Sequence, residues 1–281
     1  MGLFRYTRRT LGRELLLAAT GVVFAVPFYI VLVLSLKSNQ TIQSSPLSLP
    51  LHPHWSNYRD MWRATSAMNV TIGRSLENNV IITAASVVLI VLLGASSGYV
   101  IARRQSKLST GLYFLFVAGI VIPFWLGLVP IYVTLRNLHL TGTYLGMVAL
   151  NVGLMTPLSV FLYTGFIRTL PREYEEAAQV DGASLPRTLF RVVLPLLKPI
   201  TGTVAVLSGL ACWNDFFLPL IFLSGSKNQT LPVAIYQFVG NETFQWNLIF
   251  PTVVVALLPI MVFYLFAQKT LVKGFAGGVK G

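Results

Sequence analysis

The acidic residues of this chain are few, and four of its nine lie in one stretch, EYEEAAQVDG. They are Glu173, Glu175, Glu176 and Asp181, and they surround Ala177 and Ala178 and precede Gly182. Small side chains let another backbone approach closely, and a carboxylate at the edge of such a contact accepts a charge-assisted hydrogen bond worth about 1.5–3 kcal/mol. The stretch is therefore either a docking surface for a partner or a solvated amphipathic loop, and its residue types favour neither.

A fifth carboxylate, Asp215, follows Trp213 and Asn214 inside an otherwise apolar run. Because a charged side chain at the centre of a bilayer costs about 2.5–3.5 kcal/mol, Asp215 must face a cavity, a partner or the membrane surface. Asn214 and Asp215 are thus candidates for a translocation path or a gate. A purely structural role, satisfying a broken backbone or an interhelical hydrogen bond, is the favoured interpretation.

Neither catalytic nor metal chemistry is indicated elsewhere in the sequence. The chain has three histidines, two of them His52 and His54 in one loop, and the single cysteine Cys212. These are too few for a metal site. No phosphate-binding Gly-x-x-x-x-Gly-Lys-Ser/Thr loop occurs, so any nucleotide chemistry must belong to another chain. We expect no catalytic residue, no metal and no directly bound cofactor.

The composition is typical of a membrane protein: 54% of the residues are hydrophobic, 11% are charged, and the mean hydropathy is +0.69. A stretch of about 20 apolar residues is needed to cross a bilayer. Six such stretches predict an all-α polytopic membrane protein with six transmembrane helices, at 14–36, 80–102, 111–135, 144–167, 200–223 and 248–267. Prolines interrupt several of them, which suits a moving transporter as well as it suits ordinary kinks.

The basic residues alternate between the segments that join these stretches, and this predicts the orientation. One set of segments holds Arg5, Arg8, Arg9, Arg13, Arg103, Arg104, Lys107, Arg168, Arg172, Arg187, Arg191, Lys198, Lys269, Lys273 and Lys280. The other set holds only Lys37, Arg59, Arg63, Arg74, Arg136 and Lys227. The positive-inside rule therefore places both termini and EYEEAAQVDG in the cytoplasm. The net charge of +12 reflects topology, and no nucleic acid is expected as a partner.

The cytoplasmic segment around EYEEAAQVDG predicts two short helices joined at a glycine. Pro171 is placed to begin the first helix, and Gly182 is placed to end it. Ser184 can cap the second helix, which must end near Pro195. On the first helix, one face carries Glu173, Glu176, Ala177 and Val180. In the second apolar stretch, Gly94 and Gly98 form a small-xxx-small pair that predicts close helix packing.

These residues resemble the EAA-x-x-x-G…I-x-L-P loop of binding-protein-dependent ABC import permeases. Glu176, Ala177, Ala178 and Gly182 match the first part, and Val192 (where Ile is usual), Leu194 and Pro195 match the second. The resemblance extends from about residue 75 to the C-terminus. WNDFFLPLIFL and AQKTLVKGFAGGVKG are similar to the carbohydrate-importing subgroup, and most of all to the second permease of the pair, the maltose-G type.

The resemblance implies an organisation and a set of partners. Residues 1–74 would form an N-terminal tail, a first transmembrane helix and an outer loop. Residues 75–268 would be the permease core with a coupling loop at 169–198, and residues 269–281 a cytoplasmic tail. The partners would be a homologous permease in a heterodimer, two ATPase subunits that use ATP and Mg, and an extracytoplasmic sugar-binding protein, all at a bacterial inner membrane.

Three groups of residues receive roles from the resemblance. The ATPases would grip the coupling loop through Glu173, Glu176, Ala177, Ala178, Asp181, Gly182, Leu194 and Pro195. A C-terminal tail with Gly277, Gly278 and Lys280 would reach the ATPase interface. Gly240, Asn241 and Glu242, at the tip of an outer loop, would contact the binding protein.

The predicted function is thus that of a permease subunit in an ATP-driven sugar importer, without enzyme activity of its own. Two alternatives stay open. A permease of the same architecture could carry a non-sugar solute, and an ion-coupled secondary transporter would need intramembrane carboxylates, of which Asp215 is the only one available.

Overall fold

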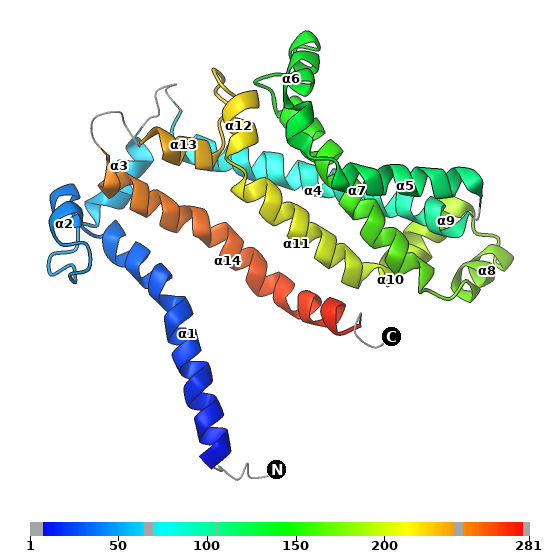
Figure 1. Cartoon of the computed structure of the whole chain (residues 1–281), viewed down its shortest axis with the longest axis horizontal. Helices are drawn as coiled ribbons and strands as arrows, with labels where there is room; N and C mark the ends of the chain where they lie inside the picture. Colours follow the sequence, from blue (N-terminus) through cyan, green and yellow to red (C-terminus); the bar gives the residue numbers. More distant parts are fainter. Residues whose placement is uncertain (1–7, 65–69, 105, 239–243, 278–281) are drawn as a thin grey trace.

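A computed structural model of the chain describes residues 8–64, 70–104, 106–238 and 244–277 (Figure 1). Arg8, Arg9, Leu185, Phe263, Tyr264 and residues 266–277 are described by their backbone alone. Within these ranges every regular element is a helix. The elements are α1 (Arg8–Ser35), α2 (Asn39–Ser44), α3 (Ser56–Arg63), α4 (Ile72–Arg103), α5 (Lys107–Val121), η1 (Phe124–Gly127), α6 (Leu128–Asn137), α7 (Tyr144–Arg168), α8 (Glu173–Val180), α9 (Leu185–Thr188), η2 (Leu189–Val193), α10 (Leu194–Leu196), α11 (Lys198–Asn214), α12 (Phe217–Phe222), α13 (Leu231–Gln237) and α14 (Trp246–Gly277).

The centre of the bundle is the contact between α4 and α7, and two glycines of α4 allow it. A Cβ on Gly98 would lie 2.8 Å from Tyr163 Cβ and 3.1 Å from Thr164 N, and one on Gly94 would overlap the Ser159 hydroxyl. The two helices can approach this closely only because these positions carry no side chain. The predicted packing role of the glycine pair is confirmed.

Among the described residues, three helices are long and apolar enough to cross a membrane: residues 10–35 of α1, α4 and α7. The count becomes five if each of two bent helix pairs is one span, and the apolar part of α14, Trp246–Val262, is shorter. The described helices therefore cover each of the six predicted apolar stretches. The fold class predicted from the sequence, an all-α polytopic membrane protein, is confirmed.

Two of the predicted spans are broken. The stretch 111–135 bends by 92° between α5 and the η1–α6 segment, where Pro123 cannot donate the helical hydrogen bond. The stretch 200–223 does not form one helix, because α11 ends at Asn214 and α12 begins at Phe217. The predicted stretch 200–223 is therefore covered by two helices separated at Asp215.

Helix α1 stands away from the bundle and touches it mainly through α14 (Figure 1). Its apolar side chains are exposed over almost its whole length: Leu16 and Phe24, for example, are 69% and 71% exposed. Such a surface is stable only when lipid or another apolar chain covers it. Helix α1 is thus built to be covered by something other than this chain.

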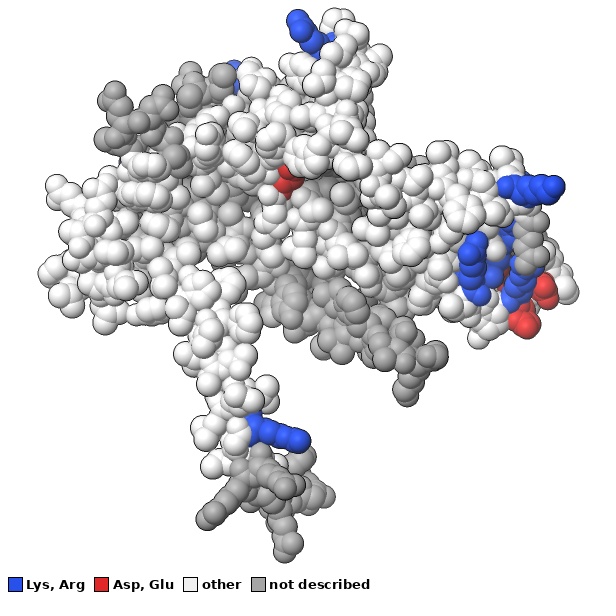
Figure 2. Space-filling view, viewed as in Figure 1, with Lys and Arg blue, Asp and Glu red and all other residues white. Residues whose placement is uncertain are grey.

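The bundle has two polar ends, which we call the α8 end and the α13 end. Helices α4 and α7 run between them, with α8 at one end and α2, α3 and α13 at the other (Figure 1). Figure 2 shows lysine and arginine side chains gathered at the α8 end, and in this view the surface between the two ends is uncharged except for one acidic side chain near its middle. This distribution places the charged ends outside a hydrocarbon layer that the uncharged belt would occupy.

Candidate coupling site

Helix α8 is short, and its ends explain why these residues form it. Glu173, Glu175 and Glu176 lie in its first turn, where carboxylates complement the positive end of the helix. At its other end Gly182 has φ of +80°, Gly182 N donates to Gln179 O, and Ala183 N donates to Ala178 O. This is a Schellman turn, which needs a left-handed residue. The predicted stop at Gly182 is confirmed, and the helix begins at Glu173 rather than at Pro171.

The chain returns from α8 to the bundle through α9, η2 and α10, which follow one another without a gap; they form the predicted second short helix, with a π-helical middle, and it ends at Leu196 next to Pro195. This segment packs Thr188, Leu189, Val193 and Leu197 as buried side chains, and the last three join the apolar core of α4 and α7. The chain then bends by 79° into α11. We call residues 185–197 the base segment. Because the base segment is packed against α4 and α7, it fixes the position of the α8 loop relative to the bundle.

The strongest contact between α8 and the bundle is an ion pair that Glu175 makes with Arg103 at the end of α4. Arg103 Nη2 lies 2.6 Å and Nε 2.7 Å from Glu175 Oε1, and the Tyr99 hydroxyl donates to Oε2 at 2.9 Å. Arg103 also donates to Leu170 O at 3.1 Å. The two side chains are only 13% and 9% exposed, so this contact is desolvated on both sides.

Because Glu175 points inward, the opposite face of α8 points outward. The predicted face of Glu173, Glu176, Ala177 and Val180 is exposed, and Val180 is 88% exposed. An apolar valine and an alanine beside two free carboxylates form a surface of mixed chemistry with no partner in the described part of the chain.

The structure brings most of the predicted coupling residues to one end. Asp181 and Gly182 are exposed next to this face, and Ala178 is half-buried beneath it. A Cβ on Gly182 would meet no atom of the chain within 4 Å, so the glycine is required for its φ and leaves open space above it. Leu194 and Pro195 lie in the base segment, half-buried and exposed respectively.

Sequence reasoning grouped Glu175 with its acidic neighbours and missed its separate role. Residues three or four apart share a helix face, and Glu175 is two residues from Glu173 and one from Glu176. This spacing already indicated that Glu175 lies on a different face of the helix. The partner could not be read from the sequence, since Arg103 lies 72 residues earlier and is one of several basic residues at that end.

Asp215 lies at the break between α11 and α12, where its Oδ1 accepts a hydrogen bond from Leu218 N at 3.3 Å. The carboxylate thus helps satisfy a broken backbone, as the structural interpretation expected. It also lines a cavity of about 320 Å³ together with Asn214, Asn151, Phe124, Trp125 and residues of α7 and α11. Two aromatic rings, two carboxamides and a carboxylate therefore meet in one hollow between the two ends of the bundle.

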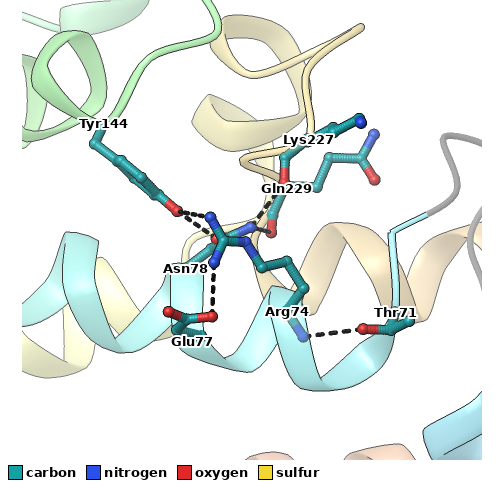
Figure 3. Close-up of polar contacts among 7 residues, drawn as sticks. All are labelled: Thr71, Arg74, Glu77, Asn78, Tyr144, Lys227 and Gln229. Atoms are coloured by element: carbon teal, nitrogen blue, oxygen red, sulfur yellow. Dashed lines mark hydrogen bonds and ion pairs between the residues drawn. The ribbon is translucent and has the colours of Figure 1, made fainter.

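At the α13 end, α4 holds the segment that follows α12 (Figure 3). Asn78 Nδ2 donates to Lys227 O at 3.1 Å and to Gln229 O at 2.8 Å, and the Tyr144 hydroxyl donates to Asn78 Oδ1 at 2.6 Å. Arg74 donates to the Tyr144 hydroxyl at 3.2 Å and pairs with Glu77 at 2.8 Å.

Much of the predicted outer loops is packed. Leu231, Val233 and Ala234 of α13 are buried, and Met61 of α3 packs in the same core with Leu231. The tip residues Gly240, Asn241 and Glu242, and the tail residues Gly278 and Lys280, lie outside the described residues. Gly277 is the last residue of α14.

The fold and the exposed α8 loop define a class of protein: a polytopic membrane permease. The chain belongs to the family described as binding-protein-dependent transport system inner membrane component, whose model matches residues 90–276. This span includes α7, α8 and the base segment, so the loop resemblance and the family model agree.

Relatives match along almost the whole chain. The melibiose/raffinose/stachyose import permease protein MelC of Bacillus subtilis is 36% identical over 269 residues, which is 95% of each chain. The probable starch degradation products transport system permease protein AmyC of Thermoanaerobacterium thermosulfurigenes is 34% identical over 278 residues, covering 97% of this chain and 99% of that protein.

A solved structure with the same fold is that of a bacterial ABC transporter involved in the import of the acidic polysaccharide alginate. One of its chains matches with a TM-score of 0.77 and 19% identity, covering 95% of this chain and 99% of that chain. A second match, with a TM-score of 0.63 and 15% identity over 92% and 94% of the two chains, is a bacterial alginate ABC transporter bound to a periplasmic protein carrying an alginate pentasaccharide. These matches establish the fold of an ABC importer permease.

Proposed function

We propose that this chain is the permease subunit of an ATP-driven importer of a sugar or oligosaccharide. The names of its relatives support a carbohydrate cargo: they include import permeases for melibiose, raffinose and stachyose, for starch degradation products, and for diacetylchitobiose. The importer would combine this chain with a homologous permease, two ATPase subunits and an extracytoplasmic sugar-binding protein. ATP and Mg would be bound by the ATPases, and this chain would have no enzyme activity.

The observation that carries the proposal is the geometry of α8. Its outward face presents the exposed residues Glu176 and Ala177, with open space at Gly182, while Glu175 holds the helix to the end of α4. A rigidly anchored helix can pass a push from a partner to the bundle, because its motion moves α4 and α7 with it. Alternating access of the permeases would follow from closure of the ATPases on this face.

The excess of lysine and arginine at the α8 end supports a cytoplasmic position for that end and for both termini. The exposed apolar length of α1 supports a second membrane subunit, since a homologous permease can cover what this chain leaves bare. The C-terminal tail with Gly277, Gly278 and Lys280 would meet the ATPases, and the tip with Gly240, Asn241 and Glu242 would meet the binding protein.

The cavity at Asn214 and Asp215 is our candidate for the solute path. Two aromatic rings, Phe124 and Trp125, offer flat apolar surfaces, and its amides and carboxylate offer hydrogen bonds to hydroxyl groups, which is the chemistry of sugar binding. Asn214→Ala tests this, because Asn214 is exposed and Asp215 also supports the backbone. We expect a raised KM for uptake with unchanged ATPase binding. An unchanged KM would exclude Asn214 from the path.

The docking proposal is tested by two substitutions on the outward face of α8. Glu176→Lys reverses the exposed charge, and Gly182→Asn adds a side chain at a position where asparagine tolerates positive φ, so the turn is kept. We expect both variants to reach the membrane and to bind the ATPase about tenfold or more weakly. Glu176→Lys removes a charge-assisted hydrogen bond worth about 1.5–3 kcal/mol, and Gly182→Asn fills the open space that a partner would occupy.

The measurement is co-purification of the ATPase and uptake of radiolabelled sugar in proteoliposomes with ATP inside. The matched control is Asp60→Lys, the same charge reversal at the α13 end, on a side chain that is 48% exposed. Normal uptake by both α8 variants would overturn the docking proposal. Uptake that needs an ion gradient and ignores ATP would favour a secondary transporter, and competition by a non-sugar solute alone would overturn the cargo.

A further inference from the structure

A second feature of the α8 end is a cavity of about 770 Å³ between the ends of α4, α5 and α7. Five basic side chains line it, with two hydroxyl groups and no carboxylate among the described residues: Arg103, Arg104, Lys107, Arg168, Arg172, Ser106 and Thr110. We call it the basic cavity. The lysines and arginines in Figure 2 gather at the end of the bundle where it lies.

The charges of the basic cavity are not balanced within the described part of the chain. Three ion pairs occur among the described residues, and only the pair of Arg103 with Glu175 includes a residue that lines the cavity. Arg168 makes a cation–π contact: its guanidinium carbon lies 5.0 Å from the centre of the Tyr113 ring. Arg104, Lys107 and Arg172 are exposed. Like charges gathered around one hollow repel one another, and an anion between them removes that cost.

The cavity's position indicates which anion it meets. It opens where α4 and α7, two helices long enough to span a membrane, come to an end, which is the depth of the lipid headgroups. Helix α5 leads away from it with Leu108, Leu112 and Leu115 exposed, of which Leu108 is 73% exposed. An apolar surface beside a basic pocket matches a ligand with a charged head and a fatty tail.

We propose that the basic cavity binds the phosphate-bearing headgroup of an anionic phospholipid, whose acyl chains lie along α5. The positive-inside rule alone explains an excess of cations at this end, but it needs only their number. It does not require that cations from three helices line one cavity without a carboxylate. This inference goes beyond the importer proposal and depends only on the helices spanning a membrane.

The test uses the assembled importer reconstituted in bilayers with a spin-labelled anionic phospholipid, phosphatidylglycerol, and with spin-labelled phosphatidylcholine for reference. The selectivity is the ratio of their association constants from electron paramagnetic resonance. The variants are Arg104→Gln, Lys107→Gln and Arg168→Gln, singly and together. We expect each to lower the selectivity by about fivefold, since a basic residue near the surface contributes about 1 kcal/mol. Arg168→Lys should retain most of it.

The matched controls are Arg63→Gln and Arg136→Gln, which remove exposed charges at or near the opposite end and should leave the selectivity unchanged. Equal loss in the controls and the cavity variants would mean that only overall charge matters and would overturn the site. Glycerol 3-phosphate distinguishes the source of the anion. If it displaces the lipid at submillimolar concentration, the cavity is a site for a free phosphate compound and the lipid assignment is wrong.

Discussion

The two ends of α4 each hold a segment that leaves the bundle, and they use different chemistry. At the α13 end, Asn78 donates from a neutral carboxamide to two backbone carbonyls (Figure 3). At the α8 end, Arg103 pairs with the carboxylate of Glu175, which also accepts from Tyr99. The segment at the α13 end is thus held through backbone carbonyls, which every residue has, and α8 is held through the side chain of one residue, Glu175.

The difference teaches what each end must control. A bond to backbone carbonyls fixes where the segment lies, whatever its side chains are. An ion pair to a side chain in the first turn of α8 also fixes the rotation of α8 about its axis, since only one face carries Glu175. That rotation decides which residues point away from the bundle. The ion pair at the α8 end therefore sets the orientation of the proposed docking face, while the Asn78 hydrogen bonds at the α13 end set only the position of the segment they hold.

The largest effect is expected from Glu175→Ala, which leaves Arg103 nearly buried without its partner. Breaking a buried pair in this way costs about 3–5 kcal/mol. We expect a lower Tm in detergent and faster hydrogen exchange in α8, with α13 unaffected. Glu176→Ala is the matched control, because its exposed side chain makes no ion pair within the described residues and its change should stay within about 0.5 kcal/mol. Equal effects at 175 and 176 would remove the distinction between the two faces.

A smaller effect is expected from Asn78→Ala at the α13 end. It leaves the carbonyls of Lys227 and Gln229 without these donors and the Tyr144 hydroxyl without its acceptor, at a cost of about 1–3 kcal/mol. Hydrogen exchange should rise in the segment after α12 and stay unchanged in α8. Asn137→Ala, on an exposed asparagine at the end of α6, is the control. A response in α8 would show that the two ends of α4 are not independent.

The sequence predicted what depends on local chemistry. The end of α8 at Gly182, the glycine pair of α4 and the face shared by Glu173, Glu176, Ala177 and Val180 follow from residue type and helical spacing, and the structure has all three. The Glu175–Arg103 pair depends on how α4 and α8 meet, which neither segment encodes alone. The break at Asp215 could be predicted from the carboxylate, whose favoured role was to satisfy a broken backbone, but not from hydropathy, because hydropathy averages over the whole stretch 200–223.

The smallest effect is expected from Glu77→Gln, which removes the other ion pair of α4. Arg74 and Glu77 are 48% and 54% exposed, in contrast to the 13% and 9% of Arg103 and Glu175. Solvent screens such a pair, so its loss should cost about 0.2–1 kcal/mol and become undetectable in high salt. Arg74 also keeps its hydrogen bond to Tyr144, and the Asn78 contacts remain. Thermal unfolding of Glu77→Gln and Glu175→Gln in low and high salt compares the two pairs directly. A loss at Glu77 as large as that at Glu175 would mean that burial is not what distinguishes the two ends of α4.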